Sequence, residues 1–483
     1  MRNKKIFLIK LFFLLLLCFQ YPLFALSPEK TSALKWVTDK SAELDSVSDD
    51  IWRYAEIAMT EYKSSKRLAD LLEKYGFTVE RNVAGMPTAF VATYGSGEPV
   101  IGVLAEYDAL PGLSQKAIPE QEPVEVGKPG HGCGHNLFGT ASVGGALAVK
   151  SVIEKFKIHG TIKLYGCPAE ETVDGKVFMV RAGLFNGVSA VLHWHPGDST
   201  RAAYGSSLAM NSFKVTFFGK TAHAAGAPWE GRSALDAVEL MNHAVNMMRE
   251  HVKPAVRMHY VITNGGRAPN IVPNEATVWY FVRDLNRKSV EELYAWVLKI
   301  TEGAAMATQT TYKVHSLTGV HETVPNKTGA ELIQKNLELI GPPPFTEEEQ
   351  TFAKTIQAAI GKEQQGLHSA IASLEEPKSD RPMGSTDVAD VSWQTPVAGF
   401  SVATEPAGTP GHHWSAVACG GMSIGKKGME VAAKAMAFSV IDLLENAQLL
   451  QTMRNEWKQQ MKGRIYKSPI PPEQKPFVVP ESE

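Results

Sequence analysis

The sequence has few cysteines and no excess of basic residues, and each shortage narrows the possible functions. It contains four cysteines in 483 residues, three of them beyond residue 25. Three thiols cannot all pair with one another, so at least one is left for another role, such as metal binding. The chain has 49 basic and 51 acidic residues. This balance gives no basic surface of the kind that nucleic-acid-binding proteins need.

Long hydrophobic runs are also scarce, and the first 25 residues contain the clearest one. Basic residues precede a leucine- and phenylalanine-rich core that runs from Leu11 to Phe19. That core is too short to cross a bilayer of about 30 Å. We therefore expect residues 1–25 to be a secretory signal peptide, and the mature chain to be periplasmic or extracellular without a stable membrane span. An uncleaved anchor is the alternative, whereas no small residue precedes Cys18 to favour a lipid anchor.

The remaining chain is long enough for more than one hydrophobic core. Hydrophobic residues make up 44% of the sequence, and removal of the four basic leader residues (Arg2, Lys4, Lys5 and Lys10) leaves 45 basic against 51 acidic residues, a net charge of −6. Chains of more than about 250–300 residues usually divide into domains. We therefore expect two domains.

Residues 130–139 form a glycine-rich segment that carries two metal-ligand side chains. Cys133 and His135 lie two residues apart, and the glycines around them allow the backbone to bend closely around an ion. A tight turn with a buried histidine is the alternative interpretation of this segment alone.

An adjacent pair of carboxylates, Glu170 and Glu171, follows the strand-like run 161–165. Adjacent side chains at the end of a strand point to opposite sides, so the two cannot easily have the same role. One carboxylate can hold a metal while the other acts as a base toward water.

Histidines recur where other strands are expected to end. His193 and His195 follow the strand-like run 190–192, and His412 and His413 follow Gly411 near the far end of the chain. Open α/β sheets build their sites where strands run out into loops. The pattern therefore indicates a metal site made from distant parts of the sequence.

Six segments in this order resemble the aminoacylase/carboxypeptidase-type metallopeptidase family, and within it the p-aminobenzoyl-glutamate and indoleacetyl-amino-acid hydrolases. The resemblance runs from about Ala33 to Leu444. The segments are AEYDALP (105–111), HGCGHN (131–136), AEE (169–171), WHP (194–196), GKTAHA (219–224) and APNIVP (268–273).

The resemblance implies a centre of two divalent metal ions, zinc or manganese. Its expected ligands are Cys133, His135, Glu171, His195 and His412, with His413 as the second choice because the tandem histidines leave the register open. Glu170 would be the catalytic base, and Asp108 would orient a ligand, although a turn-capping carboxylate is the alternative for Asp108. Cys133 would then be the thiol left over, and a Cys167–Cys419 disulfide stays open.

The expected fold is α/β: a zinc-exopeptidase-like catalytic domain with an inserted ferredoxin-like lid. Between residues 206 and 318 the order of expected elements is βαββαβ, the ferredoxin-like unit. We place the catalytic domain at 26–205 and 319–462, the lid or dimerisation domain at 206–318, and a flexible tail at 463–483. In the family this lid commonly dimerises, so a homodimer or heterodimer through the lid is expected.

Three lid residues are candidates for substrate contact. By resemblance, His223 would stabilise the oxyanion of the reaction and Asn270 would contact substrate; Arg267 could bind a substrate carboxylate, although an exposed surface arginine is the alternative. Asp387 and Asp390 invite a metal assignment, but a capped helix start is favoured for them. Residues 341–381 are expected to be a charged helical insertion without a link to chemistry.

The resemblance implies a metal-dependent amidohydrolase that cleaves an N-acyl amino acid, with p-aminobenzoyl-glutamate as an example, and releases the free amino acid. A dipeptidase or other exopeptidase of the same fold is one alternative. A catalytically silent partner subunit is the other, and the intact Glu170–Glu171 pair argues against it.

Overall fold

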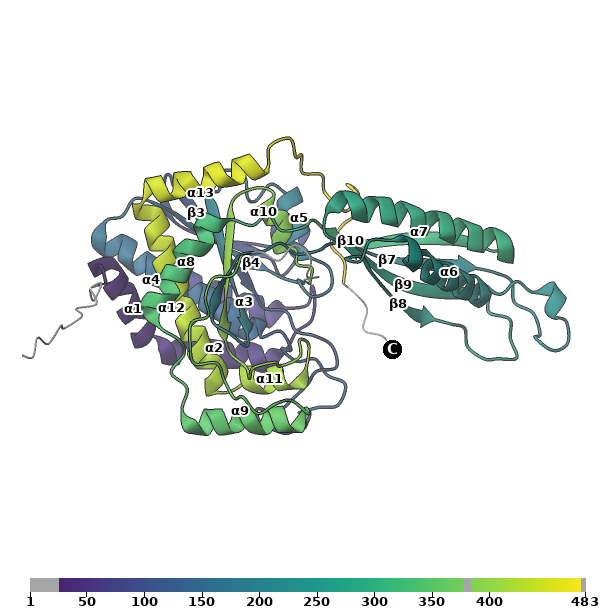
Figure 1. The fold of residues 1–483 in the computed structure, drawn as a ribbon, viewed down its shortest axis with the longest axis horizontal. Coiled ribbons are helices and arrows are strands. Elements are labelled where there is room, and N and C mark those ends of the chain that lie inside the picture. Colours follow the sequence, from purple (N-terminus) through teal and green to yellow (C-terminus); the bar gives the residue numbers. More distant parts are fainter. Residues whose placement is uncertain (1–25, 377–383, 479–483) are drawn as a thin grey trace, which may run out of the picture.

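The computed structural model describes residues 26–376 and 384–478, which form two α/β bodies (Figure 1). The larger body contains a seven-stranded sheet, and a smaller four-stranded body projects from it. The predicted signal peptide lies outside the described residues. The predicted α/β fold with an inserted ferredoxin-like unit is confirmed.

The seven-stranded sheet has the order β1-β2-β4-β3-β5-β11-β6. Its four central strands, β4, β3, β5 and β11, are parallel, whereas β1, β2 and β6 add antiparallel edges. The strands are β1 (Thr78–Arg81), β2 (Phe90–Ser96), β3 (Val100–Glu106), β4 (Gly160–Cys167), β5 (Ala190–Gly197), β6 (Arg201–Ala203) and β11 (Val397–Ala403). Because the central strands are parallel, their carboxyl ends meet at one edge, where open α/β sheets place their ligands.

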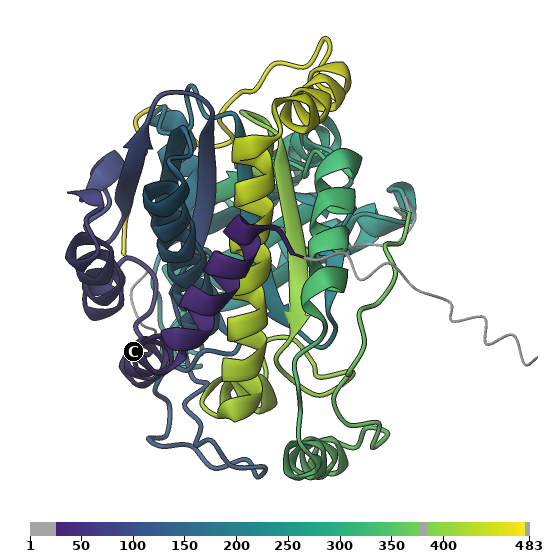
Figure 2. The same cartoon turned by 90° about the vertical axis from the view of Figure 1, so that its left-hand side faces the viewer.

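Helices cover one face of this sheet side by side (Figure 2). Helix α4 packs closely on α12 because Gly145 leaves room for Met436. The helices of this body are α1 (Pro28–Asp39), α2 (Ser41–Tyr54), α3 (Tyr62–Lys74), α4 (His135–Phe156), α5 (Gly175–Arg181), α8 (Lys327–Ile340), α9 (Glu347–Ala359), α10 (Val388–Ser392), α11 (Trp414–Gly420), α12 (Ser423–Glu445) and α13 (Ala447–Gln460).

Helix α4 lies at the centre of the larger body and begins at the metal-ligand motif. Among the described residues it is the one helix long and apolar enough to cross a membrane, but 89% of its apolar window is buried inside the protein. Its composition therefore reflects its place in the core.

The smaller body, which we call the lid, contains a fully antiparallel sheet of order β10-β7-β9-β8. Both of its long helices pack against one face of this sheet (Figure 1). The elements are β7 (Ala209–Phe218), α6 (Ala234–Met248), β8 (Arg257–Asn264), β9 (Glu275–Asp284), α7 (Arg287–Thr308) and β10 (Thr311–Val320). Buried residues alternate along β9, as expected for a strand with one covered face. The lid therefore has a core of its own.

The predicted flexible tail is wrong for residues 463–478. The Arg181 guanidinium donates hydrogen bonds to the backbone carbonyls of Pro471 (2.9 Å) and Gln474 (2.6 Å), and Ile470 is only 3% exposed. The Gln474 side chain also donates to Leu317 O of the lid strand β10. The tail thus joins the catalytic domain to the lid.

The helical insertion supports a loop of the site. Helix α9 begins with a capping box between Thr346 and Glu349. It packs on α11, and Gln357 Nε2 donates a 2.9 Å hydrogen bond to Ala407 O. Ala407 lies in the loop that leads to His412. The insertion therefore contributes to the position of a predicted metal ligand.

Candidate metal centre

The Cys133–His135 segment turns sharply before α4. Gly134 has a φ of 72°, and a Cβ atom there would come within 2.8 Å of Pro196. Glycine is thus required both by the left-handed backbone and by the close approach of the β5 end. His135 is the first residue of α4 and is completely buried.

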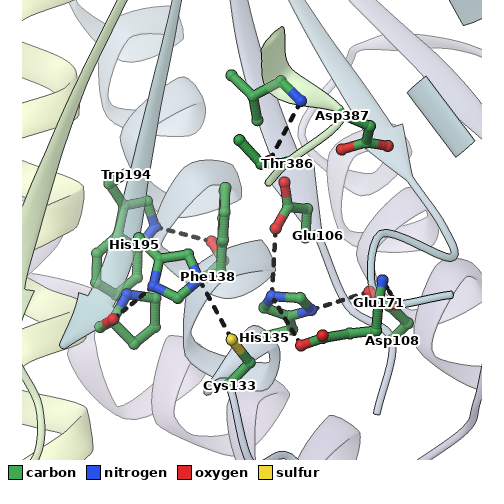
Figure 3. A network of polar contacts seen from close by, with 12 residues as sticks. Glu106, Asp108, Cys133, His135, Phe138, Glu171, Trp194, His195, Thr386 and Asp387 are labelled. Atoms are coloured by element: carbon green, nitrogen blue, oxygen red, sulfur yellow. Dashed lines mark hydrogen bonds and ion pairs between the residues drawn. The ribbon is translucent and has the colours of Figure 1, made fainter. Parts of the chain in front are cut away.

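His135 is oriented by Asp108 (Figure 3). Nδ1 of His135 lies 2.9 Å from Asp108 Oδ1, and the other carboxylate oxygen accepts a 2.9 Å hydrogen bond from the Glu171 backbone N–H. A proton on Nδ1 leaves the lone pair of Nε2 free, which is the form that binds a metal. The structure therefore places Asp108 where the sequence expectation placed it, behind a ligand.

The other predicted ligands gather around Cys133. His195 Nε2 lies 3.4 Å from Cys133 Sγ, while its Nδ1 lies 2.5 Å from the carbonyl oxygen of Pro196. His412 Nε2 lies 3.2 Å from Glu171 Oε2. The ligand atoms form two groups, each within 4.8 Å: Cys133, His135 and His195, and Cys133, Glu171 and His412.

Between the tandem histidines, the structure turns His412 toward this cluster and His413 away from it. The His413 ring instead bonds to Ser415 and caps the start of α11. Cys133 belongs to both groups of ligand atoms, so the five predicted ligands form one connected set.

The donor set fits a metal ion. Nε2 of His135 and Oε1 of Glu171 are buried and accept or donate no hydrogen bond within the described residues. Burial and the neighbouring Glu170 raise the pKa of Glu171 to about 8, and burial and Glu171 raise the pKa of the Cys133 thiol well above its usual value. A divalent cation would lower the pKa of each acid and occupy the unpaired atoms.

Glu170 faces a different group of side chains from Glu171. Its carboxylate lies with Glu106 and Nε2 of His135, all within 4.8 Å. Glu106 is held by an ion pair of 2.6 Å with Lys176, which also binds Asp387 at 2.6 Å. Sequence reasoning missed both Glu106 and Lys176. Their positions, at the end of β3 and in the first turn of α5, were the available signal.

A cavity of about 550 Å³ opens beside these groups and lies between the catalytic domain and the lid. Its lining includes the catalytic side chains and lid residues; they are Glu106, Leu110, Cys133, Phe138, Glu170, Glu171, Thr172, Asp174, His193, His195, Met210, Phe281, Arg283, Thr318, Gly384, Ser385, Thr386, Val388 and His412. Arg283, on β9, forms no hydrogen bond or ion pair with the described residues, and its Nε is buried. The cavity therefore has an unpaired cation close to the candidate metal centre.

The structure does not bring three predicted lid residues into this cavity. His223, Asn270 and Arg267 are exposed and do not line it. The His223 ring is fixed by hydrogen bonds from the backbone N–H groups of Ala225 and Gly226 to Nδ1, at 3.3 and 3.0 Å, so Nε2 is free. Within one chain, Arg283 occupies the place that Arg267 was expected to take.

The two aspartates of the 384–392 segment are not among the metal-binding groups of the described residues. Asp387 stands at the start of α10, but its side chain makes no capping bond; it accepts from Lys176 instead. Asp390 accepts hydrogen bonds from His321 N (3.0 Å) and Tyr466 Oη (2.9 Å). The favoured helix-cap interpretation is therefore wrong about their partners.

The disulfide left open by the sequence does not form. Cys133, Cys167 and Cys419 are all free thiols. Cys167 ends β4 and packs with Tyr165, whereas Cys419 lies in α11 against α9. The two buried cysteines thus belong to different hydrophobic clusters.

Comparisons with known proteins agree with this architecture. The Peptidase dimerisation domain family matches residues 209–306, which cover most of the lid. The chain is 41% identical to a p-aminobenzoyl-glutamate hydrolase chain of Escherichia coli strain K12, over 88% of this chain and 94% of that protein. It is 28% identical to a Xaa-Arg dipeptidase of Mus musculus, over 89% and 92% of the two chains.

A solved structure shares the fold. A dinuclear metal-binding peptidase of the M20 family from Bacillus subtilis superimposes with a TM-score of 0.56 at 18% identity, covering 84% of this chain and 99% of that one.

Proposed function

The chain belongs to the M20 peptidase family of metal-dependent hydrolases, and from that premise we propose that it cleaves the amide bond of N-acyl amino acids. The observation that carries this proposal is the cavity in which the predicted ligands, the free Glu170 carboxylate and the unpaired Arg283 guanidinium face one space. The 41% identical relative is named as a p-aminobenzoyl-glutamate hydrolase, which supports an acyl amino acid as substrate.

Two divalent ions, zinc or manganese, would be held by Cys133, His135, Glu171, His195 and His412. Such ions, when bound, polarise the amide carbonyl and make water a better nucleophile near neutral pH. Two ions are favoured because the ligand atoms form two groups that share Cys133, and because the Bacillus relative is described as a dinuclear metal-binding peptidase.

Glu170 is the base of the proposed reaction. It faces the cavity from the loop after β4, on the side of Glu106 and away from the Cys133–His412 group. Its carboxylate takes the proton from the attacking water and later delivers that proton to the leaving nitrogen. The amide carbon–nitrogen bond then breaks, and the products are a carboxylic acid and a free amino acid.

Arg283 binds the carboxylate of the substrate. A guanidinium without a protein partner, half-buried beside a cavity, matches a carboxylate in charge and geometry. The lid thus recognises the amino-acid half, while the catalytic domain holds the scissile amide.

The test is a turnover assay of the purified full chain with added Mn²⁺ or Zn²⁺. N-benzoyl and p-aminobenzoyl amino acids are compared with unblocked dipeptides of the same amino acid. Hydrolysis of the acyl amino acids supports the proposal. Faster cleavage of the dipeptides would favour the second candidate, a dipeptidase, which the Xaa-Arg dipeptidase relative supports. No turnover of any substrate with metal bound would favour a catalytically silent subunit.

We further propose that the chain dimerises through the lid, as a homodimer or with a second type of chain. The match of residues 209–306 to the Peptidase dimerisation domain family supports this. Export to the periplasm or beyond remains a proposal that rests on the basic, leucine-rich segment at residues 1–25.

A further inference from the structure

Four buried polar atoms that lack a hydrogen-bonding partner within the described residues line one wall of the cavity. They are Asp174 Oδ2, Arg283 Nε, Thr318 Oγ1 and Ser385 Oγ. Asp174 is only 6% exposed and Thr318 only 2%. Buried polar groups in folded proteins are rarely left unpaired. This wall is therefore built to bind a polar group that enters the cavity.

Both bodies of the protein contribute to the wall. Asp174 directly precedes α5 of the catalytic domain, whereas Arg283 and Thr318 lie on β9 and β10 of the lid. The loop that ends at α10 supplies Ser385. A ligand bound here would contact the catalytic domain and the lid at once.

Apolar side chains surround these polar groups. Met210, Phe281 and Val388 line the same cavity, and the Arg283 guanidinium lies 5.1 Å from the centre of the Phe281 ring. A wall with apolar surface and a few polar atoms suits a side chain with an aliphatic stem and a polar end.

Charge favours a positive end. Asp174 and Arg283 form no ion pair with each other, although both face the cavity. If the substrate carboxylate binds Arg283, Asp174 is left without a counter-charge in a wall that also contains Glu170. Burial, together with the charges of Asp387 and Glu170, raises the pKa of Asp174 well above its usual value. A cation beside Asp174 would reverse that shift.

We propose that Asp174, with Thr318 and Ser385, forms a subsite for a cationic side chain on an aliphatic stem, so that the amino acid released is lysine, ornithine or arginine. This specificity rests on the proposed function, because it assumes that Arg283 holds the carboxylate of an N-acyl amino acid. Asp174 accepts hydrogen bonds from the cation, and the two hydroxyl groups accept hydrogen bonds from its remaining N–H groups.

The experiment uses the full chain loaded with Mn²⁺ and three substrates that differ only in the amino-acid side chain: N-benzoyl-L-lysine, N-benzoyl-L-leucine and N-benzoyl-L-glutamate. The readout is the ratio of kcat/KM for lysine over leucine. We expect the wild-type ratio to be at least about tenfold, and Asp174→Asn to lower it by at least about tenfold, since one charge-assisted hydrogen bond is lost.

Two further variants make the test specific. Thr318→Val keeps the shape of the side chain and should lower the same ratio by a smaller factor, which tests the subsite even if Asp174→Asn does not fold. Asp39→Asn, at an exposed position on α1, is the matched control and should leave the ratio unchanged.

Calorimetric binding of free L-lysine, L-leucine and L-glutamate separates this inference from the proposed function. The three probes share their α-amino and α-carboxyl groups, so differences report the side chain. Lysine binding that is tighter than leucine binding and weakened in Asp174→Asn supports the subsite even if no substrate is hydrolysed. Equal binding and equal kcat/KM for lysine and leucine would overturn it. A preference for glutamate that survives Asp174→Asn would also overturn it, since the wall would then be selecting an acidic side chain without using the charge of Asp174.

Discussion

Oδ1 of Asp108 lies 2.9 Å from Nδ1 of His135, and both side chains are completely shielded from solvent. Asp108 thereby fixes the ring so that Nε2 faces the candidate metal centre, and it also holds the Glu171 backbone. We predict that Asp108→Asn lowers the affinity for metal by about 10–100-fold, the usual cost of losing the partner that orients a ligand. Metal titration of the purified variant, followed by calorimetry, measures this. Wild-type affinity in the variant would show that Asp108 has only a structural role.

The two neighbouring carboxylates should respond differently to the same substitution. Glu170→Gln is expected to abolish turnover while metal content stays near wild type, because Glu170 faces Glu106 and not the Cys133–His412 group. Glu171→Gln is expected to lose metal, because Glu171 lies 3.2 Å from His412. Metal analysis of both purified variants decides this. Equal metal loss would mean that the third group of ligand atoms, with Glu106 and Glu170, also binds an ion.

Cys133 should be a metal ligand and a free thiol. We predict that Cys133→Ala lowers both metal content and activity, since the thiol belongs to both groups of ligand atoms. Cys167→Ala is the matched control, because Cys167 is buried but outside those groups. Mass mapping of the active native protein should find Cys133 unpaired; a disulfide at Cys133 would remove it from the ligand set.

Arg283 and Arg267 provide a direct test of carboxylate recognition. Arg283→Gln should raise KM for an N-acyl amino acid by about 10–100-fold, as expected for the loss of a hydrogen bond of about 1.5–3 kcal/mol to a charged group. It should have little effect on the corresponding carboxamide, which the wild type is expected to hydrolyse poorly. Arg267→Gln, which changes an exposed residue outside the cavity, should leave both substrates unaffected. The reverse pattern would restore the sequence-based choice of Arg267.

The metal-ligand motifs could be predicted from the sequence because each lies at the end of a strand or the start of a helix. Cys133, His135 and Glu171 follow from local patterns and the expected strand ends, and the tandem histidines left only a choice between neighbours. That choice required the structure, since it depends on the left-handed backbone of His412, with a φ of 54°, and on the bond from His413 to Ser415.

Other parts of the site could not be predicted because they depend on contacts between distant segments. Arg283 is one of several charged residues on a strand of alternating burial, and only the packing of lid and catalytic domain places it in the cavity. Residues 463–478 have the proline-rich composition of a solvated tail. Their backbone carbonyls nevertheless accept hydrogen bonds from Arg181, and composition carries no information about such a partner.

His223 combines a strong resemblance with a position outside the cavity of its own chain. A role at the substrate carbonyl therefore requires either movement of the lid or a second copy of the chain. Nε2 of His223 is free and the residue is exposed, so it can approach either site. We predict that His223→Ala lowers kcat by about a hundredfold or more while metal stays bound, as expected for a lost oxyanion donor.

Mixing two inactive variants separates the two routes by which His223 could act. His223→Ala and Glu170→Gln are refolded or co-expressed together, so that mixed dimers contain one site with an intact Glu170 from one chain and an intact His223 from the other. If His223 acts across the dimer, random pairing should restore activity to about a quarter of the wild-type value, because half of the dimers are mixed and each has one complete site. If His223 acts within its own chain, no mixed dimer contains a complete site and activity stays at the level of the single variants. A change confined to KM in His223→Ala would instead make the histidine a contact of the bound substrate.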